Sequence, residues 1–267
     1  MAGREQHHEI EIDATADAVW NEIASGEGLK RWLAEDAKVT DGVEGQQWVS
    51  WGQGQEMAVQ HLVWQPGERL QLGQRGDDLS GWDALVMDWT IESKGGKAIL
   101  RLCQSGMPET PDWDDTYDST TVGWRLFFAA IKHGLEQHAG KTRRTIFRSG
   151  PVEAPRDGAW KKFFAEFDPK GELEGLGVGD RYSTTTSTGA SIEGRVVLHD
   201  PGRNFSVTID GYDNALMSVD FGGLGASCYV NFILSTFDWS EEQMKGIEGP
   251  WVGLLDRLLP VPAPAEE

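Results

Sequence analysis

Hydrophobic and polar positions along the chain repeat one order of predicted elements twice. In the first half, residues 7–13 alternate apolar and polar side chains as a half-buried strand does, and residues 19–24 place apolar side chains at helical spacing. Residues 114–138 form a longer amphipathic pattern typical of a helix. Short strand candidates lie between the helices, joined by tight-turn signals such as Pro66-Gly67, and they predict an antiparallel meander. The candidates are residues 46–51, 57–64, 69–74, 84–92 and 97–104.

The second half begins the same series again. Residues 142–149 have the pattern of a strand, and aromatic side chains at helical spacing follow in residues 160–167. A second Pro-Gly turn, Pro201-Gly202, separates two strand candidates as the first one does. The final segment, residues 240–259, is again amphipathic and predicts a helix. The strand candidates here begin near residue 180 and continue with residues 195–199, 204–210, 215–221 and 227–236.

The length of the chain agrees with two domains. Its 267 residues suit two units of about 130 residues each, with a boundary near Lys141. We therefore predict an α+β chain with domains at residues 1–141 and 142–267, each an antiparallel sheet with a long C-terminal helix. Residues 170–179 are rich in glycine where the first half has a short helix carrying Trp32, so the second half lacks that helix. We expect a disordered tail from about residue 260.

Charge and cysteine content restrict the partners and the compartment. Lys and Arg number 24 against 43 Asp and Glu, a formal net charge of -19, which repels nucleic acid and anionic membrane surfaces. No stretch has the ~20 apolar residues of a membrane span, and residues 1–13 show no apolar signal core. Cys103 and Cys228 lie far apart in strand-like sequence and are expected to be buried free thiols. These features predict a cytoplasmic protein whose oligomeric state the sequence does not reveal.

Groups able to carry catalysis are scarce in the sequence. No histidine pairs with a cysteine or an acid at a metal-ligand spacing, and no nucleophile elbow, P-loop or dinucleotide motif occurs. His133 and His138 are five residues apart on a predicted helix and are expected to be solvated. His61, in a predicted strand, is the one histidine placed to act as a general base. We predict no catalytic constellation, no metal and no cofactor.

Several short motifs occur together between residues 7 and 138. They are Ile10-Glu11-Ile12-Asp13-Ala14, Ala18-Val19-Trp20, Gly28-Leu29 with Trp32, Pro66-Gly67-Glu68-Arg69-Leu70, Asp88-Trp89-Thr90-Ile91-Glu92, Leu100-Arg101-Leu102, Gln104-Ser105-Gly106 and Gly123-Trp124. As a set they resemble the SRPBCC (START-like) superfamily, and more narrowly its branch of heat-shock ATPase activator homologues. The second half resembles this superfamily only in outline and is interpreted as a divergent second copy.

The resemblance implies a helix-grip fold, in which a curved antiparallel sheet wraps around the last helix and leaves an apolar cavity between them. Members of the superfamily bind lipids, sterols, hormones and polyketides. Some act as aromatase/cyclases, and several actinobacterial members protect their hosts from reactive aromatic antibiotics. Such a fold does not by itself select one of these functions.

Apolar side chains on strand faces and helices supply the candidate ligand-binding residues. Alternation along the strands places part of the predicted lining residues on one face of the sheet. The resemblance implies that this face is directed toward the last helix. His61 and Arg101, together with Gln104, are the candidate polar groups for orienting a ligand. The predicted lining consists of Trp32, Trp48, Trp64, Leu72, Leu85, Met87, Trp89, Ile91, Leu100, Leu102, Gln104, Phe127 and Ile131.

Three functions are compatible with these observations. The first is binding of apolar, polycyclic aromatic or polyketide-type small molecules for sequestration, carriage or self-resistance to a natural product. A variant of it is quenching of a bound radical at a glycine Cα, for which Gly222, Gly223 and Gly225 are the conspicuous cluster. The second is a polyketide cyclase or aromatase, and the third is a regulator of a chaperone ATPase.

Overall fold

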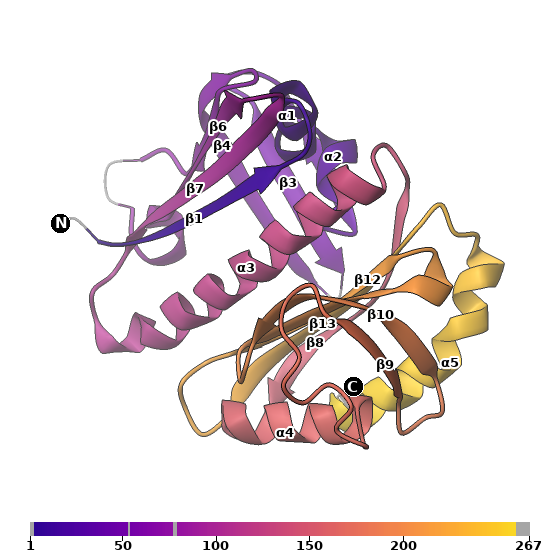
Figure 1. Cartoon of the computed structure of the whole chain (residues 1–267). Helices are drawn as coiled ribbons and strands as arrows, with labels where there is room; N and C mark the ends of the chain where they lie inside the picture. Colours follow the sequence, from indigo (N-terminus) through magenta and orange to yellow (C-terminus); the bar gives the residue numbers. More distant parts are fainter. Residues whose placement is uncertain (1–2, 53, 77–78, 260–267) are drawn as a thin grey trace, which may run out of the picture. The chain divides into compact units, whose positions relative to one another are not determined.

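A computed structural model describes residues 3–52, 54–76 and 79–259 of the chain. The tail predicted from about residue 260 lies outside these residues. The chain divides into two compact units (Figure 1). The first comprises Met1–Tyr117 and Phe127–Lys141, and the second comprises Asp118–Leu126 and Thr142–Glu267. The middle of the long helix, which the sequence assigned to the first domain, thus belongs to the second unit by its contacts.

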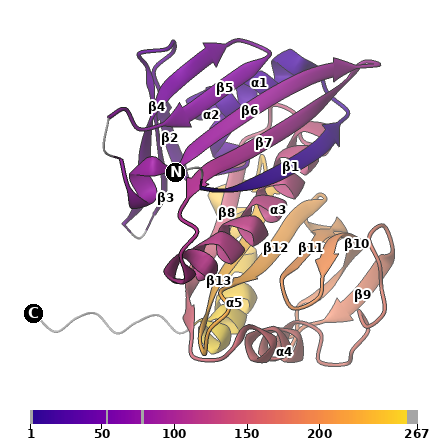
Figure 2. The same ribbon diagram turned by 90° about the vertical axis from the view of Figure 1, so that its left-hand side faces the viewer.

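The first unit contains one seven-stranded antiparallel sheet in the order β1-β7-β6-β5-β4-β3-β2 (Figure 2). The antiparallel meander predicted from the short turns is confirmed. The strands are β1 (Arg4–Ile12), β2 (Asp36–Val39), β3 (Gln46–Gly52), β4 (Gln55–Gln65), β5 (Arg69–Gly73), β6 (Val86–Lys94) and β7 (Lys97–Met107). The helices are α1 (Ala16–Ala24), α2 (Gly26–Lys30), the short η1 (Gly81–Ala84) and η2 (Pro111–Trp113), and the two ends of α3 (Asp114–Gln137).

Local sequence explains how the two short helices follow one another. Thr15 caps α1 by accepting a hydrogen bond from the Ala18 amide, and Ser25 caps α2 by accepting one from the Gly28 amide at 2.9 Å. Gly28 also permits a close approach of the helices, since a Cβ there would lie 2.0 Å from the carbonyl oxygen of Asn21. These contacts place Trp20 of α1 and Trp32, just after α2, on the sheet.

Two features of this sheet were not predicted. The edge strand β2 is only four residues long and lacks a clear alternation, so its pattern did not distinguish it from a loop. In β4 the pairing with β5 shifts between His61 and Val63. This bulge puts one extra residue into β4, and side chains three positions apart then share a face.

The second unit repeats the arrangement with a six-stranded antiparallel sheet in the order β8-β13-β12-β11-β10-β9. Residues 168–180 form turns and no helix, as predicted for the glycine-rich stretch. The final helix is fixed at its start by a capping box between Ser240 and Gln243. The elements are β8 (Arg143–Val152), α4 (Arg156–Phe167), β9 (Arg181–Thr185), β10 (Ser191–Asp200), β11 (Asn204–Ile209), η3 (Asp210–Tyr212), β12 (Ala215–Gly222), β13 (Cys228–Phe237) and α5 (Glu241–Leu258).

The predicted α+β class with two tandem helix-grip units is confirmed by these two antiparallel sheets and their helices. Among the described residues, no helix is both long and apolar enough to cross a membrane.

Candidate functional site

A row of paired residues crosses the inner face of the first sheet. His61 pairs with Leu72, Leu72 with Met87, Met87 with Gln104, and Gln104 with Gln6. Directly paired residues of antiparallel strands point to the same face, so these five side chains lie side by side. All five are buried. The inner face therefore combines an apolar centre with polar groups at both ends of the row.

A cluster of aromatic rings packs on this face beside the row. The ring of Trp32 lies edge-on to Trp89 at 6.1 Å and to Phe127 of α3 at 6.2 Å. Trp89 also stacks on Phe128 at 5.8 Å. The Trp32 indole donates a hydrogen bond to the Glu22 carbonyl oxygen at 2.9 Å, which satisfies its only polar group. Phe128 was missing from the predicted set, although its position next to Phe127 on an amphipathic helix was an available signal.

Most of the predicted lining residues are packed core. A side chain with almost no exposed surface touches no space that admits water, and protein atoms surround it on every side. Of the predicted set only Trp48, Trp64 and Phe127 are half-buried. The buried members are Trp32, Leu72, Leu85, Met87, Trp89, Ile91, Leu100, Leu102, Gln104 and Ile131.

Two predicted site residues lie on the outer face of the sheet. Arg101 forms ion pairs with Glu9 at 2.5 Å and with Glu92 at 2.8 Å, and the hydrogen bonds to Glu92 and Glu9 raise the pKa of its guanidinium. Trp48 lies under the ammonium group of Lys38 at 5.0 Å. The predictions that Arg101 orients a ligand and that Trp48 lines the site were therefore wrong. Strand alternation could have excluded Arg101, because its neighbours Leu100 and Leu102 were both assigned to the inner face.

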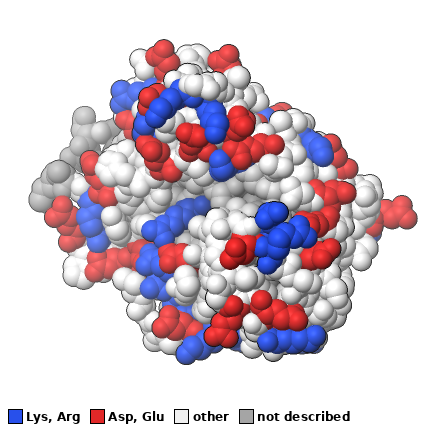
Figure 3. All heavy atoms as spheres, in the orientation of Figure 1, with Lys and Arg blue, Asp and Glu red and all other residues white. Residues whose placement is uncertain are grey.

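Several other exposed side chains pair with an opposite charge, such as Lys97 with Glu11 at 2.8 Å. Acidic and basic side chains are interspersed on the face shown in Figure 3, where red and blue atoms lie next to each other. Exposed ion pairs of this kind contribute little to stability, typically below about 1 kcal/mol each.

A column of three rings leads from the edge of the first unit to its interior. Trp20 and Trp64, both half-buried, meet edge-on at 5.1 Å, and Trp64 stacks on His61 at 4.5 Å with the rings 22° from parallel. The bulge in β4 makes this stack possible, because without it residues 61 and 64 would point to opposite faces. The column is the part of the inner face where aromatic surface remains partly accessible.

His61 stands at the buried end of the column. Its side chain is 0% exposed, and its Nδ1 atom lies 2.9 Å from the Gly42 carbonyl oxygen. Burial lowers the pKa of the imidazole, and the hydrogen bond to Gly42 and the charge of Asp41 offset this only in part. The ring is consequently neutral at physiological pH. That His61 orients a ligand stays a prediction.

The two histidines at the end of α3 are buried, so the expectation that they are solvated was wrong. His133 is 7% exposed and His138 is 4% exposed, and their ring centroids lie 5.1 Å apart. His138 follows the last residue of the helix, with non-helical backbone angles. The helical spacing that separates residues five apart therefore does not apply to this pair.

One group of side chains in the described residues has the spacing of a metal site. Ligand atoms of Glu5, His7 and Cys103 all lie within 4.8 Å of one another. Burial raises the pKa of the Cys103 thiol, and the negative charges of Glu5 and Asp88 raise it further. Because metals bind the thiolate, this environment opposes coordination at neutral pH.

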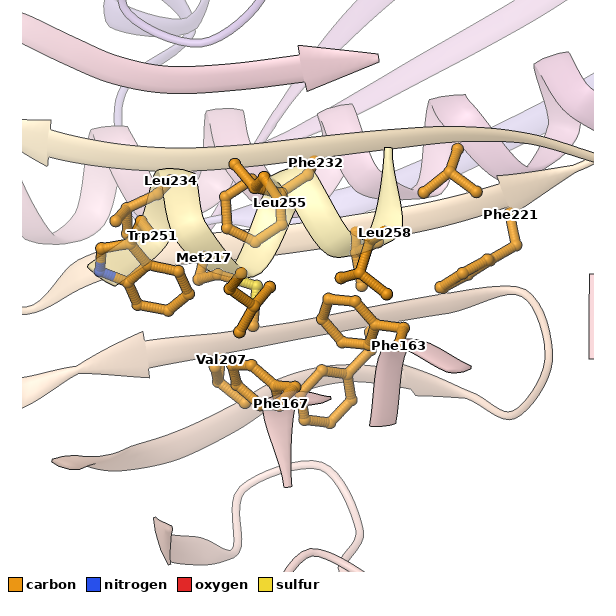
Figure 4. Close-up of a cluster of buried hydrophobic side chains, with 14 of the residues drawn as sticks. Phe163, Phe167, Val207, Met217, Phe221, Phe232, Leu234, Trp251, Leu255 and Leu258 are labelled. Carbon is orange, nitrogen blue, oxygen red and sulfur yellow. The ribbon is translucent and has the colours of Figure 1, made fainter. Parts of the chain in front are cut away.

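The second unit has its own apolar core between the sheet and helices α4 and α5. Figure 4 shows Trp251, Leu255 and Leu258 of α5 directed at Phe163 of α4 and at the strands. A small cavity remains there, with about 10 Å³ of free space, roughly the room of one water molecule. Its lining is Val152, Ala159, Lys162, Phe163, Val219, Phe221, Val230, Phe232, Leu255, Leu258 and Leu259.

Backbone geometry accounts for the glycines at the end of β12. Gly222 allows Ser119 to approach, since a Cβ at position 222 would lie 2.5 Å from the Ser119 hydroxyl oxygen. Gly223 has a φ of 97°, a conformation that favours glycine. These two positions thus have structural reasons to be glycine.

Comparison with known proteins identifies the first unit. Residues 13–136 match the family model of the Activator of Hsp90 ATPase homolog 1-like proteins. The first domain is therefore an SRPBCC-type domain of this activator-homologue family, and the resemblance seen in the sequence motifs is confirmed. A search of curated proteins finds no significant relative.

Solved structures with similar folds include single domains and a di-domain protein. The Aha1 dimer from Colwellia psychrerythraea is 19% identical, with a TM-score of 0.45, over 51% of this chain and 99% of that chain. The di-domain ARO/CYC BexL from the BE-7585A biosynthetic pathway is 14% identical, with a TM-score of 0.41, over 95% of this chain and 91% of that chain. CalU16 from Micromonospora echinospora is 18% identical, with a TM-score of 0.39, over 49% of this chain and 74% of that chain. Similarities at these TM-scores carry no functional inference.

Proposed function

We propose that the first unit binds apolar, polycyclic aromatic or polyketide-type small molecules on the inner face of its sheet, and that the protein sequesters or carries them. Self-resistance to a natural product is the biological role we propose for this binding, in the cytoplasm, where the two free thiols Cys103 and Cys228 would stay reduced. The family assignment of residues 13–136 supports a fold that binds hydrophobic molecules.

The column of Trp20, Trp64 and His61 is the observation that carries this proposal. It offers flat aromatic surface that is partly accessible at one end and leads to a buried polar group at the other. Offset stacking on such rings favours flat aromatic guests. The fully packed residues around the column, such as Leu72 and Trp89, then form the rigid wall of the site.

The expected affinity follows from the surface that a guest would bury. A polycyclic ligand burying about 400 Å² of apolar surface gains on the order of 10 kcal/mol. Loss of translational and rotational freedom opposes this by at least ~4 kcal/mol. Dissociation constants near the micromolar range are therefore expected without a charged anchor.

A tryptophan-fluorescence titration with fatty acids, sterols and polycyclic aromatic compounds tests the proposal. We expect saturable quenching by the polycyclic class, with the ligand recovered unchanged. Trp64→Leu removes the central ring of the column, and we expect it to weaken binding about tenfold in equilibrium dialysis. Trp82→Leu is the matched control, because Trp82 is 65% exposed and lies outside the column.

Other outcomes of this titration separate the alternatives. Recovery of a cyclised or dehydrated product would replace the binding function with that of a cyclase. Equal affinity of the Trp64 variant and the wild type would remove the column from the site. No response to any ligand class would contradict the proposed function.

A further inference from the structure

We propose that Glu5, His7 and Cys103 form a binding site for a thiophilic divalent metal ion of the Zn²⁺ class on the outer face of the first sheet. Glu5 and His7 belong to the edge strand β1, and Cys103 belongs to the neighbouring strand β7 (Figure 2). This site is separate from the proposed ligand site, which lies on the inner face of the same sheet.

Strand pairing brings the three side chains together on the outer face. His7 pairs directly with Cys103, so their side chains lie side by side. Glu5 precedes His7 by two residues and shares its face, because alternate residues of a strand point the same way. The adjacent pair, Gln6 and Gln104, belongs to the inner face. The cluster therefore joins two segments that are remote in the sequence, and spacing along the chain gave no sign of it.

The distances within the cluster suit a tetrahedral ion. All the ligand atoms lie within 4.8 Å of one another, and Nε2 of His7 lies 3.3 Å from Oε2 of Glu5. Two atoms bound at ~2.0 Å to a tetrahedral Zn²⁺ are about 3.3 Å apart, and a thiolate sulfur at ~2.3 Å is about 3.5 Å from each of them. The side chains of His7 and Glu5 are 70% and 55% exposed. They are therefore open to ions from solution and free to rotate toward the sulfur.

The set of donor atoms selects the kind of metal. Thiolate, imidazole and carboxylate groups all bind Zn²⁺, whereas Mg²⁺ and Ca²⁺ prefer oxygen ligands. Because the pKa of the Cys103 thiol is raised, the thiol keeps its proton in the metal-free protein, and an ion must displace that proton into solvent as it binds. This cost favours ions that form a strong bond to thiolate sulfur. Three protein ligands leave the fourth tetrahedral position to water.

The charges around the cluster show which carboxylate attracts the ion. Asp88 pairs directly with Cys103 and so lies on its other side. Arg69 donates hydrogen bonds to Asp88 at 2.6 and 2.9 Å, and Gln71 donates a third at 3.0 Å. These contacts engage both carboxylate oxygens of Asp88, and the guanidinium neutralises its charge. Glu5 is then the carboxylate that attracts and binds the cation.

A Co²⁺ titration of the full-length protein tests this inference, because Co²⁺ replaces Zn²⁺ in tetrahedral sites and its absorption spectrum reports a thiolate ligand. We expect a thiolate-to-cobalt charge-transfer band that Zn²⁺ abolishes by competition. The band should be absent in Cys103→Ser and retained in Cys228→Ser, which removes the other free thiol. His7→Ala and Glu5→Gln should each weaken Zn²⁺ binding by at least about tenfold. Glu11→Gln is the matched control, since Glu11 is 54% exposed on the same face of β1 and pairs with Lys97.

Several outcomes would overturn the site. They are a wild type without the charge-transfer band, a band that survives in Cys103→Ser, and a band that is lost in a folded Cys228→Ser variant. Zn²⁺ affinity that is unchanged in either His7→Ala or Glu5→Gln would also overturn it, as would an equal loss in Glu11→Gln. Thermal unfolding checks that each variant is folded. None of these results bears on the proposed function, because the two sites lie on opposite faces of the sheet.

Discussion

Asp220→Asn is expected to stabilise the second unit at neutral and alkaline pH. Asp220 lies on β12, is 4% exposed, and accepts a hydrogen bond from the Asn231 amide at 2.9 Å. Burial raises the pKa of its carboxyl group to about 7, although the hydrogen bonds from Asn231 oppose the shift. A neutral amide keeps an oxygen to accept that bond and avoids a buried charge.

The sign of the pH dependence follows from this raised pKa. The folded state holds a proton on Asp220 up to about pH 7, whereas the unfolded chain releases it near pH 3.8. The folded form therefore loses stability as the pH rises between these values, and the loss is complete above pH 7. The difference corresponds to roughly 4 kcal/mol at most.

Urea unfolding of both proteins at pH 5 and pH 8 measures this effect. The variant should exceed the wild type by a few kcal/mol at pH 8 and by much less at pH 5. Asp256→Asn is the matched control, since Asp256 is 54% exposed in its ion pair with Arg148 and should change little at either pH. Parallel pH profiles of the wild type and the Asp220 variant would contradict a protonated carboxyl group in the folded protein.

Trp32→Ala should destabilise the first unit by about 3–5 kcal/mol, the range for removing a buried aromatic side chain. Trp32 is 2% exposed, packs on Trp89 and Phe127, and donates to the Glu22 carbonyl oxygen. Truncation leaves a cavity and removes the donor of a buried carbonyl group. Denaturant unfolding measures the loss.

Trp82→Ala is the control for this substitution. The Trp82 side chain is 65% exposed and should change the free energy of unfolding by no more than about 0.5 kcal/mol. Similar losses for the two variants would contradict the assignment of Trp32 to the packed core. A loss of ligand binding in Trp32→Ala without a loss of stability would return Trp32 to the ligand-contacting residues.

The periodicity of the sequence was sufficient to predict the architecture of the chain. Alternation and helical spacing predicted the two antiparallel sheets and the two long helices because each element buries one face. Alternation also assigned Leu85, Met87, Trp89 and Ile91 to one buried face. The short edge strand β2 buries too little to leave such a signal.

The candidate site was less predictable because it depends on irregular geometry. A bulge in β4 puts His61 and Trp64 on one face, and strict alternation would have separated them. An aromatic side chain can either be packed in the core or remain accessible to a ligand, and which of the two holds depends on residues remote in the sequence. Trp89 is an example, because Phe128 from a distant helix stacks on its ring. The rings of His133 and His138 are in contact because the helix ends between the two residues. The spacing of apolar residues alone does not predict where the helix ends.

The most direct test of the central claim is to observe the tryptophan indole N–H resonances by NMR while a saturating amount of 2-naphthol is added. Single Trp→Phe variants assign the resonances. We expect shifts for Trp20 and Trp64, the two partly accessible rings of the column, and none for exposed Trp82 or for Trp251 in the packed core of the second unit. Shifts confined to Trp82 or Trp251, or no shifts at all, would contradict binding at the inner face of the first sheet.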